Sequence, residues 1–152
     1  MELPKKNQKG FTLIELVVVI AVLAILLGIT LVAINPAKQF SDARDTQRRS
    51  DVNAILNAVH QYAADPANGG YPAGIPDGDG GGVATNIGSA AGDVNICASL
   101  VTTFIAAIPA DPQNGSYTDC ASYSSGYNIL ETGGRITVSA PSAESGTISV
   151  TR

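Results

Sequence analysis

One continuous apolar run near the amino end limits what this chain can become. The run extends from Phe11 to Ile34, which is 24 residues with a single charged side chain, Glu15. Because a helix rises about 1.5 Å per residue, a helix of this length spans about 36 Å and can cross a hydrocarbon layer about 30 Å thick. The run is therefore predicted to be a transmembrane helix.

Basic residues flank the run on its amino side only, at Lys5, Lys6 and Lys9. Positively charged flanks stay on the cytoplasmic side of a membrane, so the short amino end is expected in the cytoplasm. The remainder of the chain is then expected on the outer side, and the precursor is predicted to be a single-pass protein of the cytoplasmic membrane.

A secretory signal peptide also begins with basic residues followed by apolar ones, and it is the first alternative. Its apolar region is usually about 7–15 residues long, which is shorter than this run. The residues that follow the run, NPAKQF, make a weak cleavage site. An ordinary membrane anchor is the second alternative, and the length of the run does not exclude it.

Glu15 distinguishes the run from a simple anchor. A carboxylate deep in an apolar span costs about 2.5–3.5 kcal/mol to insert, and the run contains no Lys, Arg or His to pair with it. Cleavage before Phe11 would create a new α-amino group, which could approach Glu15 of the same helix or of a neighbouring chain packed in register. The second arrangement predicts a charge that is unpaired in the single subunit and paired in an assembly.

The segment from Lys9 to Glu15, KGFTLIE, resembles the class III signal of type IV prepilins and type II secretion pseudopilins. The resemblance covers roughly the first 65 residues. It implies a prepilin peptidase that cuts between Gly10 and Phe11 and N-methylates Phe11, and an inter-subunit role for Glu15. It also implies three further partners: other pilin subunits in a homopolymer, an inner-membrane assembly platform with its ATPase, and membrane lipid before assembly.

The predicted organisation has four parts: a leader at 1–10, the transmembrane and assembly helix at 11–34, an amphipathic half of the same long helix at 35–64, and a globular head at 65–152. Asn35 and Pro36 are typical of a helix N-cap and first turn. An apolar face at helical spacing then predicts contact with the head, and it contains Val52, Ile55, Leu56, Val59, Tyr62 and Ala63.

Charged residues alternate in sign along the other side of this second helical half. They are Asp42, Arg44, Asp45, Arg48, Arg49 and Asp51. Their spacing predicts the intrahelical pairs Asp45–Arg49 and Arg48–Asp51 on a solvated face. Contact between neighbouring subunits is the alternative function of this face, whereas the alternating acids disfavour DNA binding.

The head is expected to begin with a loose segment from Asn68 to Gly92 that contains the sequence DGDGGG. Asp77 and Asp79 are spaced like the start of a calcium loop, but Gly81 and Gly88 occupy positions where further ligands would stand. A flexible acidic loop is therefore predicted. Apolar residues at helical spacing then predict a short helix from an N-cap at Asp93 to Ile108, which Pro109 ends.

Alternating residues near the carboxyl end predict a small antiparallel sheet. Tyr127 to Glu131 and Arg135 to Ser139 are joined by Thr132-Gly133-Gly134, which is typical of a hairpin, and Gly146 to Thr151 supplies a third strand. A long helix packed on such a sheet is an α+β arrangement. The resemblance implies the same architecture, the pilin fold.

The chain contains two cysteines, Cys97 and Cys120. In an exported chain they predict one disulfide, which would contribute roughly 3 kcal/mol by restricting the unfolded state. His60 is the only histidine, and a packing role is favoured over metal binding or catalysis because no ligand-type residues surround it on the helix. The sequon at Asn114 is short enough to occur by chance.

Charge and motifs limit the possible functions. Without the first ten residues the chain has six Lys and Arg and twelve Asp and Glu, a net charge of about −6, which disfavours nucleic acid as a partner. No nucleophile elbow, metal-ligand cluster or phosphate-binding loop occurs in the sequence, so neither an enzyme nor a cofactor is predicted.

The leading prediction is a structural subunit of an extracellular, type IV pilus-like surface filament. One alternative is a pseudopilin of a type II secretion system. The resemblance gives major pseudopilins an acidic calcium loop near the carboxyl end and usually no disulfide, whereas the last twenty residues here contain one acid, Glu144. A minor or competence pilin that binds DNA or a surface ligand is the other alternative, although Arg135 and Arg152 alone do not form a basic patch.

Overall fold

The computed structural model describes residues 10–152, and the chain divides into two compact units. The first ends at Gln39 and the second extends from Phe40 to Arg152. Most of the predicted leader, including its three lysines, lies outside the described residues.

The first unit contains helix α1 (Leu13–Ile34), which is long and apolar enough to cross a membrane. All of its side chains are exposed in the single chain, including those of Leu16, Ile20 and Leu27. A helix that is apolar on every side is stable only against lipid or other helices. The transmembrane prediction for this segment therefore agrees with the structure.

A local break separates α1 from helix α2 (Pro36–Ala64). Asn35 has a left-handed conformation, with a φ of 46°, and Pro36 has no N–H to continue the hydrogen bonding of α1. The backbone N–H of Lys38 donates to the backbone oxygen of Asn35 at 3.1 Å and lies 3.4 Å from its Oδ1. The predicted helix restart at Asn35 and Pro36 is confirmed.

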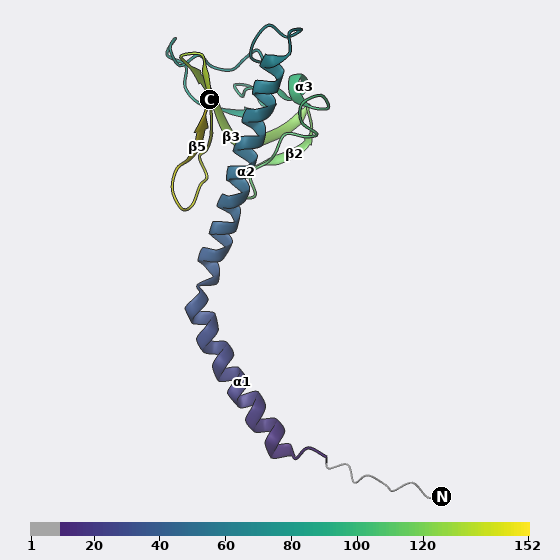
Figure 1. Ribbon diagram of the computed structural model, residues 1–152, viewed down its shortest axis with the longest axis vertical. Coiled ribbons are helices and arrows are strands. Elements are labelled where there is room, and N and C mark those ends of the chain that lie inside the picture. The colour runs from purple at the N-terminus through teal and green to yellow at the C-terminus, as the bar shows by residue number, and fades with distance from the viewer. Residues whose placement is uncertain (1–9) are drawn as a thin grey trace, which may run out of the picture. The chain divides into compact units, whose positions relative to one another are not determined.

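From Phe40 onward, α2 belongs to the second unit and packs on the sheet (Figure 1). The side chains of Val52, Ile55, Leu56 and Val59 are completely buried, and Tyr62 packs at the edge of the same core. The apolar face predicted from helical spacing is therefore the face that forms the core.

The sheet has five strands and is antiparallel throughout (Figure 1). They are β1 (Thr85–Gly88), β2 (Ser116–Asp119), β3 (Ser122–Thr132), β4 (Arg135–Ala140) and β5 (Ile148–Thr151). The order is β1-β3-β4-β5, and β2 also pairs with β3. Long β3 therefore organises the sheet, and its buried Tyr127 and Ile129 face α2 together with Ile136 and Val138 of β4.

The hairpin between β3 and β4 is formed as predicted. Gly133 and Gly134 both have positive φ, 58° and 73°, which a two-residue turn between twisted strands requires. The third predicted strand pairs with β4 from Ile148 to Thr151. These strands and α2 confirm the α+β pilin-like fold.

Two expectations for the middle of the head are wrong. The predicted helix from Asp93 to Ile108 is reduced to α3 (Cys97–Leu100), and the Asp93 side chain accepts a hydrogen bond from Asn86 instead of capping a helix. The β-branched residues after Leu100 disfavour a helix, and Thr102 has a positive φ of 73°. Strand β1 forms within the segment expected to be loose, because β3 offers it a partner.

The acidic loop is attached to the end of the β3–β4 hairpin. The N–H of Gly78 donates to the backbone oxygen of Glu131 at 2.7 Å, and the N–H of Gly133 donates to Oδ2 of Asp79 at 2.7 Å. Asp77 Oδ1 accepts the N–H of Asp79 within the loop. These carboxylates therefore bind backbone donors, and residues 10–152 contain no cluster of three His, Cys, Asp or Glu arranged for a metal.

Candidate functional site

The start of α1 forms a capping box between Thr12 and Glu15. The backbone N–H and the hydroxyl of Thr12 both donate to Glu15 Oε2, at 3.0 and 2.9 Å. The N–H of Glu15 lies 3.3 Å from Thr12 Oγ1 and donates to it in return. The sequence forms this arrangement because a Thr three residues before a Glu satisfies backbone donors that a helix start leaves open.

The capping box adds hydrogen bonds to Glu15 that the sequence did not predict. The charge of the carboxylate was expected to have no cation beside it in the single chain, and the group accepts two hydrogen bonds from Thr12. Both reach Oε2, and none of the hydrogen bonds among the described residues involves Oε1. The carboxylate also lies in the first turn of α1, where the helix dipole favours a negative charge. Thr12 therefore provides hydrogen bonds to one of the two carboxylate oxygens, and it carries no positive charge.

Gly10 and Phe11 lie before the helix in non-helical backbone. The Phe11 side chain is 92% exposed, and Thr12 has the extended conformation of an N-cap. The peptide bond between Gly10 and Phe11 is therefore outside the hydrogen bonds of α1, and an enzyme can reach it without unwinding the helix.

Residues 5–31 match the family model of the prokaryotic N-terminal methylation motif. The chain carries a class III prepilin signal. The matched segment contains the Gly10–Phe11 bond, the Thr12–Glu15 capping box and most of α1. No curated protein and no solved structure matches the chain. The prepilin signal supports a precursor of the type IV pilin or pseudopilin type, and it fits an inner-membrane protein.

A second group of functional-type residues lies in the head and is centred on Arg48 of α2. The Arg48 side chain is 0% exposed and forms a two-pronged ion pair with Asp111, from Nε to Oδ2 at 2.6 Å and from Nη2 to Oδ1 at 3.3 Å. Its Nη1 donates to Asp45 Oδ1 at 2.9 Å. Arg48 therefore joins α2 to a loop 63 residues further along the chain.

Glu144 extends this group to the loop between β4 and β5. Arg44 donates from Nε and Nη2 to the two oxygens of Glu144, both at 2.6 Å, and Arg48 Nη1 donates to Glu144 Oε1 at 3.0 Å. The backbone N–H groups of Glu144 and Ser145 donate to the Asp45 carboxylate. We refer to Arg44, Asp45, Arg48, Asp111 and Glu144 as the charged cluster.

The charged cluster corrects the prediction of a solvated charged face on α2. Asp45, Arg48 and Asp51 are buried, while Arg49 is exposed. Neither predicted intrahelical pair is formed: Asp45 binds Arg48, and Asp51 accepts hydrogen bonds from Tyr127 Oη and Gln47. Helical spacing in α2 gives no sign of Asp111 as a partner, because Asp111 lies 63 residues further along the chain than Arg48.

Ion pairing changes the acidity of the cluster. Burial alone would raise the pKa of Asp45, but hydrogen bonds from the Glu144 N–H, Arg48 and Ser145 lower the pKa to about 2. Hydrogen bonds from Arg44 and Arg48 lower the pKa of Glu144 to about 2. Burial opposes ionisation of Asp111 as well, yet Arg48 and the N–H groups of Gln113 and Asn114 hold its pKa below the ordinary value. All three acids are therefore charged in the folded head at neutral pH.

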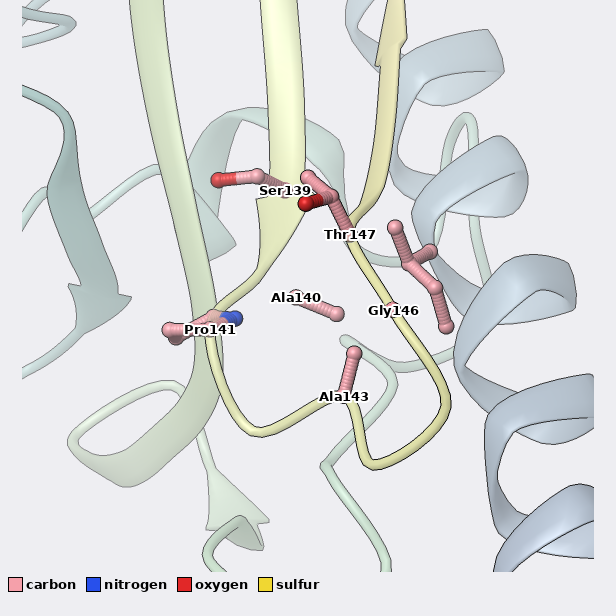
Figure 2. A pocket seen from close by; sticks show the side chains of 7 residues that line it. Ser139, Ala140, Pro141, Ala143, Gly146 and Thr147 are labelled. Carbon is pink, nitrogen blue, oxygen red and sulfur yellow. The ribbon is translucent and has the colours of Figure 1, made fainter.

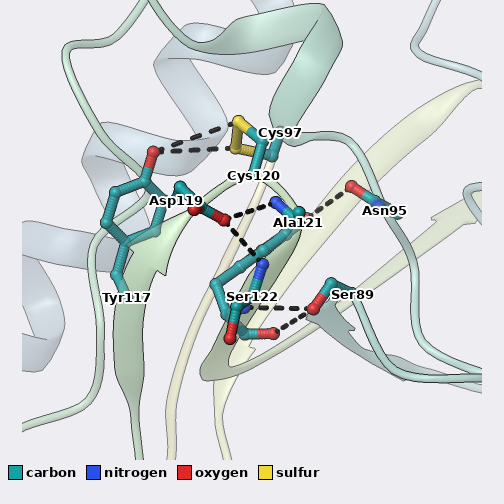
Figure 3. The surroundings of a disulfide bond; sticks show 9 residues. Ser89, Asn95, Cys97, Tyr117, Asp119, Cys120, Ala121 and Ser122 are labelled. Atoms are coloured by element: carbon teal, nitrogen blue, oxygen red, sulfur yellow. Dashed lines mark hydrogen bonds between the residues drawn. A yellow bond between two sulfur atoms is a disulfide. The ribbon is translucent and has the colours of Figure 1, made fainter.

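The two cysteines form a disulfide between α3 and the turn that joins β2 to β3 (Figure 3). The Cα atoms of Cys97 and Cys120 are 5.3 Å apart, and the Tyr117 hydroxyl lies 3.8 and 4.0 Å from the two sulfur atoms. The bond therefore connects the one-turn helix to the sheet.

The remaining candidate residues have packing roles. His60 is half-buried, and its ring meets the Tyr71 ring edge to face at 5.7 Å.

A pocket of about 360 Å³ lies beside the β4–β5 loop, and it is lined by Ser139, Ala140, Pro141, Ala143, Gly146, Thr147 and Ile148 (Figure 2). None of these lining residues is an acid, base or thiol, so the pocket offers no titratable group for chemistry.

Replacing Arg48 should unfold the head far more easily than replacing its exposed neighbour Arg49. Arg48→Met leaves buried Asp111 and Asp45 without their cation, and loss of one partner of a buried pair costs about 3–5 kcal/mol of unfolding free energy. Arg49→Met, at an exposed site, should change it by no more than about 0.5 kcal/mol. Chemical denaturation of the detergent-solubilised variants measures both, and equal stabilities would contradict the assigned role of Arg48.

The charged cluster also predicts loss of head stability in acid. The pKa values of Asp45 and Glu144 fall to about 2 on folding, from ordinary values of 3.8 and 4.5. Because folding lowers both values, the stabilisation is complete above about pH 4.5 and is lost as the pH falls toward 2. Denaturation midpoints measured across this range should fall steeply for the natural chain and less steeply for Asp45→Asn/Glu144→Gln. Equal slopes would mean that other groups cause the acid sensitivity.

Proposed function

We propose that this chain is a structural subunit of a type IV pilus-like surface filament, made as a membrane-inserted precursor. The observation that carries the proposal is the methylation motif at residues 5–31, which is continuous with an apolar, fully exposed helix. Assembly into filaments and processing by a prepilin peptidase follow from that motif.

Processing separates Gly10 from Phe11, and the new amino group of Phe11 is then methylated. Both residues precede α1 and are exposed, which supports access by a membrane-embedded peptidase. The cut leaves the Thr12–Glu15 capping box intact, because each of its hydrogen bonds lies after Phe11. The mature helix therefore begins with a positive charge one residue before its N-cap.

Glu15 selects the position of the neighbouring subunit. Thr12 binds Oε2 of the carboxylate, and the other oxygen remains available to accept an ammonium group from an adjoining chain. In an apolar surrounding such a charge-assisted bond is stronger than at a wet surface. The pairing of Glu15 with the Phe11 amine of a neighbour then sets the register in which subunits add.

The apolar surface of α1 supplies the contact area of assembly. Side chains such as Leu13, Ile25 and Leu31 are exposed in the single chain and face lipid before assembly. Packing against the α1 helices of other subunits replaces these lipid contacts with close side-chain packing. The head is carried outward as a preformed unit, and the inner-membrane assembly platform and its ATPase supply the work of extraction.

The environment of Glu144 favours a pilus over a secretion pseudopilus. The carboxylate is bound by Arg44 and Arg48, so the one acid near the carboxyl end is not available for a calcium loop. The disulfide between Cys97 and Cys120 supports the same choice.

Binding of DNA is disfavoured, because Arg152 donates a hydrogen bond to Asn57 and Arg135 is its only basic neighbour in the sheet.

Mass spectrometry of the amino terminus tests this function. Material sheared from the cell surface should yield a chain that begins with N-methylated Phe11, and the membrane fraction should contain both this form and the precursor. An intact Met1 in surface material, or an end near Asn35, would contradict the processing and indicate an anchor or a secreted protein.

A pair of variants separates assembly from membrane insertion in the same fractions. Glu15→Ala should remain in the membrane and be lost from sheared fibres. The control Val17→Ala, which changes an apolar side chain in the same turn, should enter fibres normally. Normal fibres of Glu15→Ala would remove the assigned role of the carboxylate, while methylated Phe11 in the membrane would still establish processing.

A further inference from the structure

The head contains the same seven-residue pattern twice. Residues 65–71 read DPANGGY and residues 111–117 read DPQNGSY, so each copy contains an Asn-Gly pair. In such a pair the backbone nitrogen of Gly can approach the side-chain carbonyl carbon of the preceding Asn, because Gly has no Cβ to obstruct it. The two copies form an internal comparison, since their local sequences are nearly identical and their surroundings differ.

The second copy is held tightly by the charged cluster. The N–H of Gly115 donates to the backbone oxygen of Asp111 at 2.9 Å, and the N–H of Asn114 donates to Asp111 Oδ1 at 2.9 Å. A Cβ placed on Gly115 would lie 2.7 Å from the backbone oxygen of Ser125, so Gly115 lies in closely packed surroundings. The nitrogen of Gly115 is therefore both hydrogen-bonded and closely surrounded.

The first copy is open. Gly69 and Gly70 have positive φ, 69° and 152°, and nothing lies within 4 Å of a Cβ placed on either residue. Within residues 10–152, no acceptor binds the N–H of Gly69. The side-chain amide of Asn68 donates one hydrogen bond, from Nδ2 to the backbone oxygen of Tyr62 at 3.0 Å, and the backbone N–H of Asn68 donates to the backbone oxygen of Asp65 at 3.0 Å. Backbone rotation at Gly69 therefore meets neither a steric barrier nor a hydrogen bond that must break.

We infer that Asn68 is a site of spontaneous deamidation and that Asn114 is protected from the same reaction by the fold. The Gly69 nitrogen loses its proton and attacks Cγ of Asn68, the Cγ–Nδ2 bond breaks, and ammonia leaves with that proton. The resulting five-membered succinimide is opened by water at one of its two carbonyls. The products are aspartate and isoaspartate at position 68, and no oxidation or reduction occurs.

The modification acts on the end of α2. The Asn68 amide donates to the carbonyl of Tyr62 in the last turn of that helix, and the product carboxylate has no proton to donate. The new negative charge also lies three residues from Asp65 and near the carboxyl end of α2, where the helix dipole disfavours it. Deamidation is therefore expected to loosen the last turn of α2 and to increase the acidity of the loop that follows.

Peptide mapping by mass spectrometry tests the inference on the full chain in detergent micelles, with its disulfide intact. The chain is incubated in mildly alkaline buffer made with ¹⁸O-labelled water, and the label is followed at both asparagines. We expect Asn68 to take up the label at least about tenfold faster than Asn114, because the Gly115 nitrogen must first lose a hydrogen bond and its packing. Equal rates in the folded chain, or faster labelling at Asn114, would overturn the inference.

Two controls connect the difference to the structure. In denaturant with the disulfide reduced, both asparagines should take up the label at similar rates; a persistent difference would mean that local sequence, and not the fold, protects Asn114. The variant Gly69→Ala places a methyl group in open space, although its φ of 69° is one that alanine rarely adopts, and it should slow labelling at Asn68 while leaving Asn114 unchanged. Unchanged labelling at Asn68 in this variant would exclude attack by the residue 69 nitrogen.

Discussion

A single carboxylate at the start of an apolar helix is the constraint on which the rest of this molecule depends. Glu15 is the only charged residue between Leu13 and Ile34, and insertion of a carboxylate at membrane depth costs about 2.5–3.5 kcal/mol. The capping box reduces that cost, since Thr12 supplies two donors to one oxygen. The precursor can therefore remain in the membrane, yet its carboxylate still lacks a cation.

In the head, the buried charges pair with one another. Arg48 is completely buried, and it is stable there because Asp111, Asp45 and Glu144 surround it with carboxylate oxygens. The cluster fastens α2 to two loops, while the disulfide between Cys97 and Cys120 fastens α3 to the sheet. The charges of the cluster and the two cysteines are thus paired within the head. Most of the exposed large apolar side chains among residues 10–152 lie on α1.

Sequence patterns predicted the parts of this fold in which neighbouring residues determine the structure. The apolar run, the break at Asn35 and Pro36, the buried face of α2 and the hairpin at Gly133 and Gly134 are all local features, and all are present. Strands β1 and β2 were missed because their short polar sequences form strands only by pairing with β3.

The charged cluster was missed for a related reason. The alternating charges of α2 are equally compatible with a solvated face, and Asp111 and Glu144 lie 63 and 96 residues from Arg48. Only the folded sheet brings these side chains together. The methylation motif was predictable from seven residues because it is a local sequence. Packing in the head, by contrast, depends on contacts between residues that are distant in the chain.

A fibre structure at side-chain resolution tests the central claim most directly, through the distance between each Glu15 carboxylate and the nearest Phe11 amino nitrogen of another subunit. The account predicts a separation within the roughly 4 Å of an ion pair, with Thr12 of the same chain still bound to the other carboxylate oxygen. A fibre in which Glu15 contacts Thr12 alone and faces away from every neighbouring terminus would contradict it.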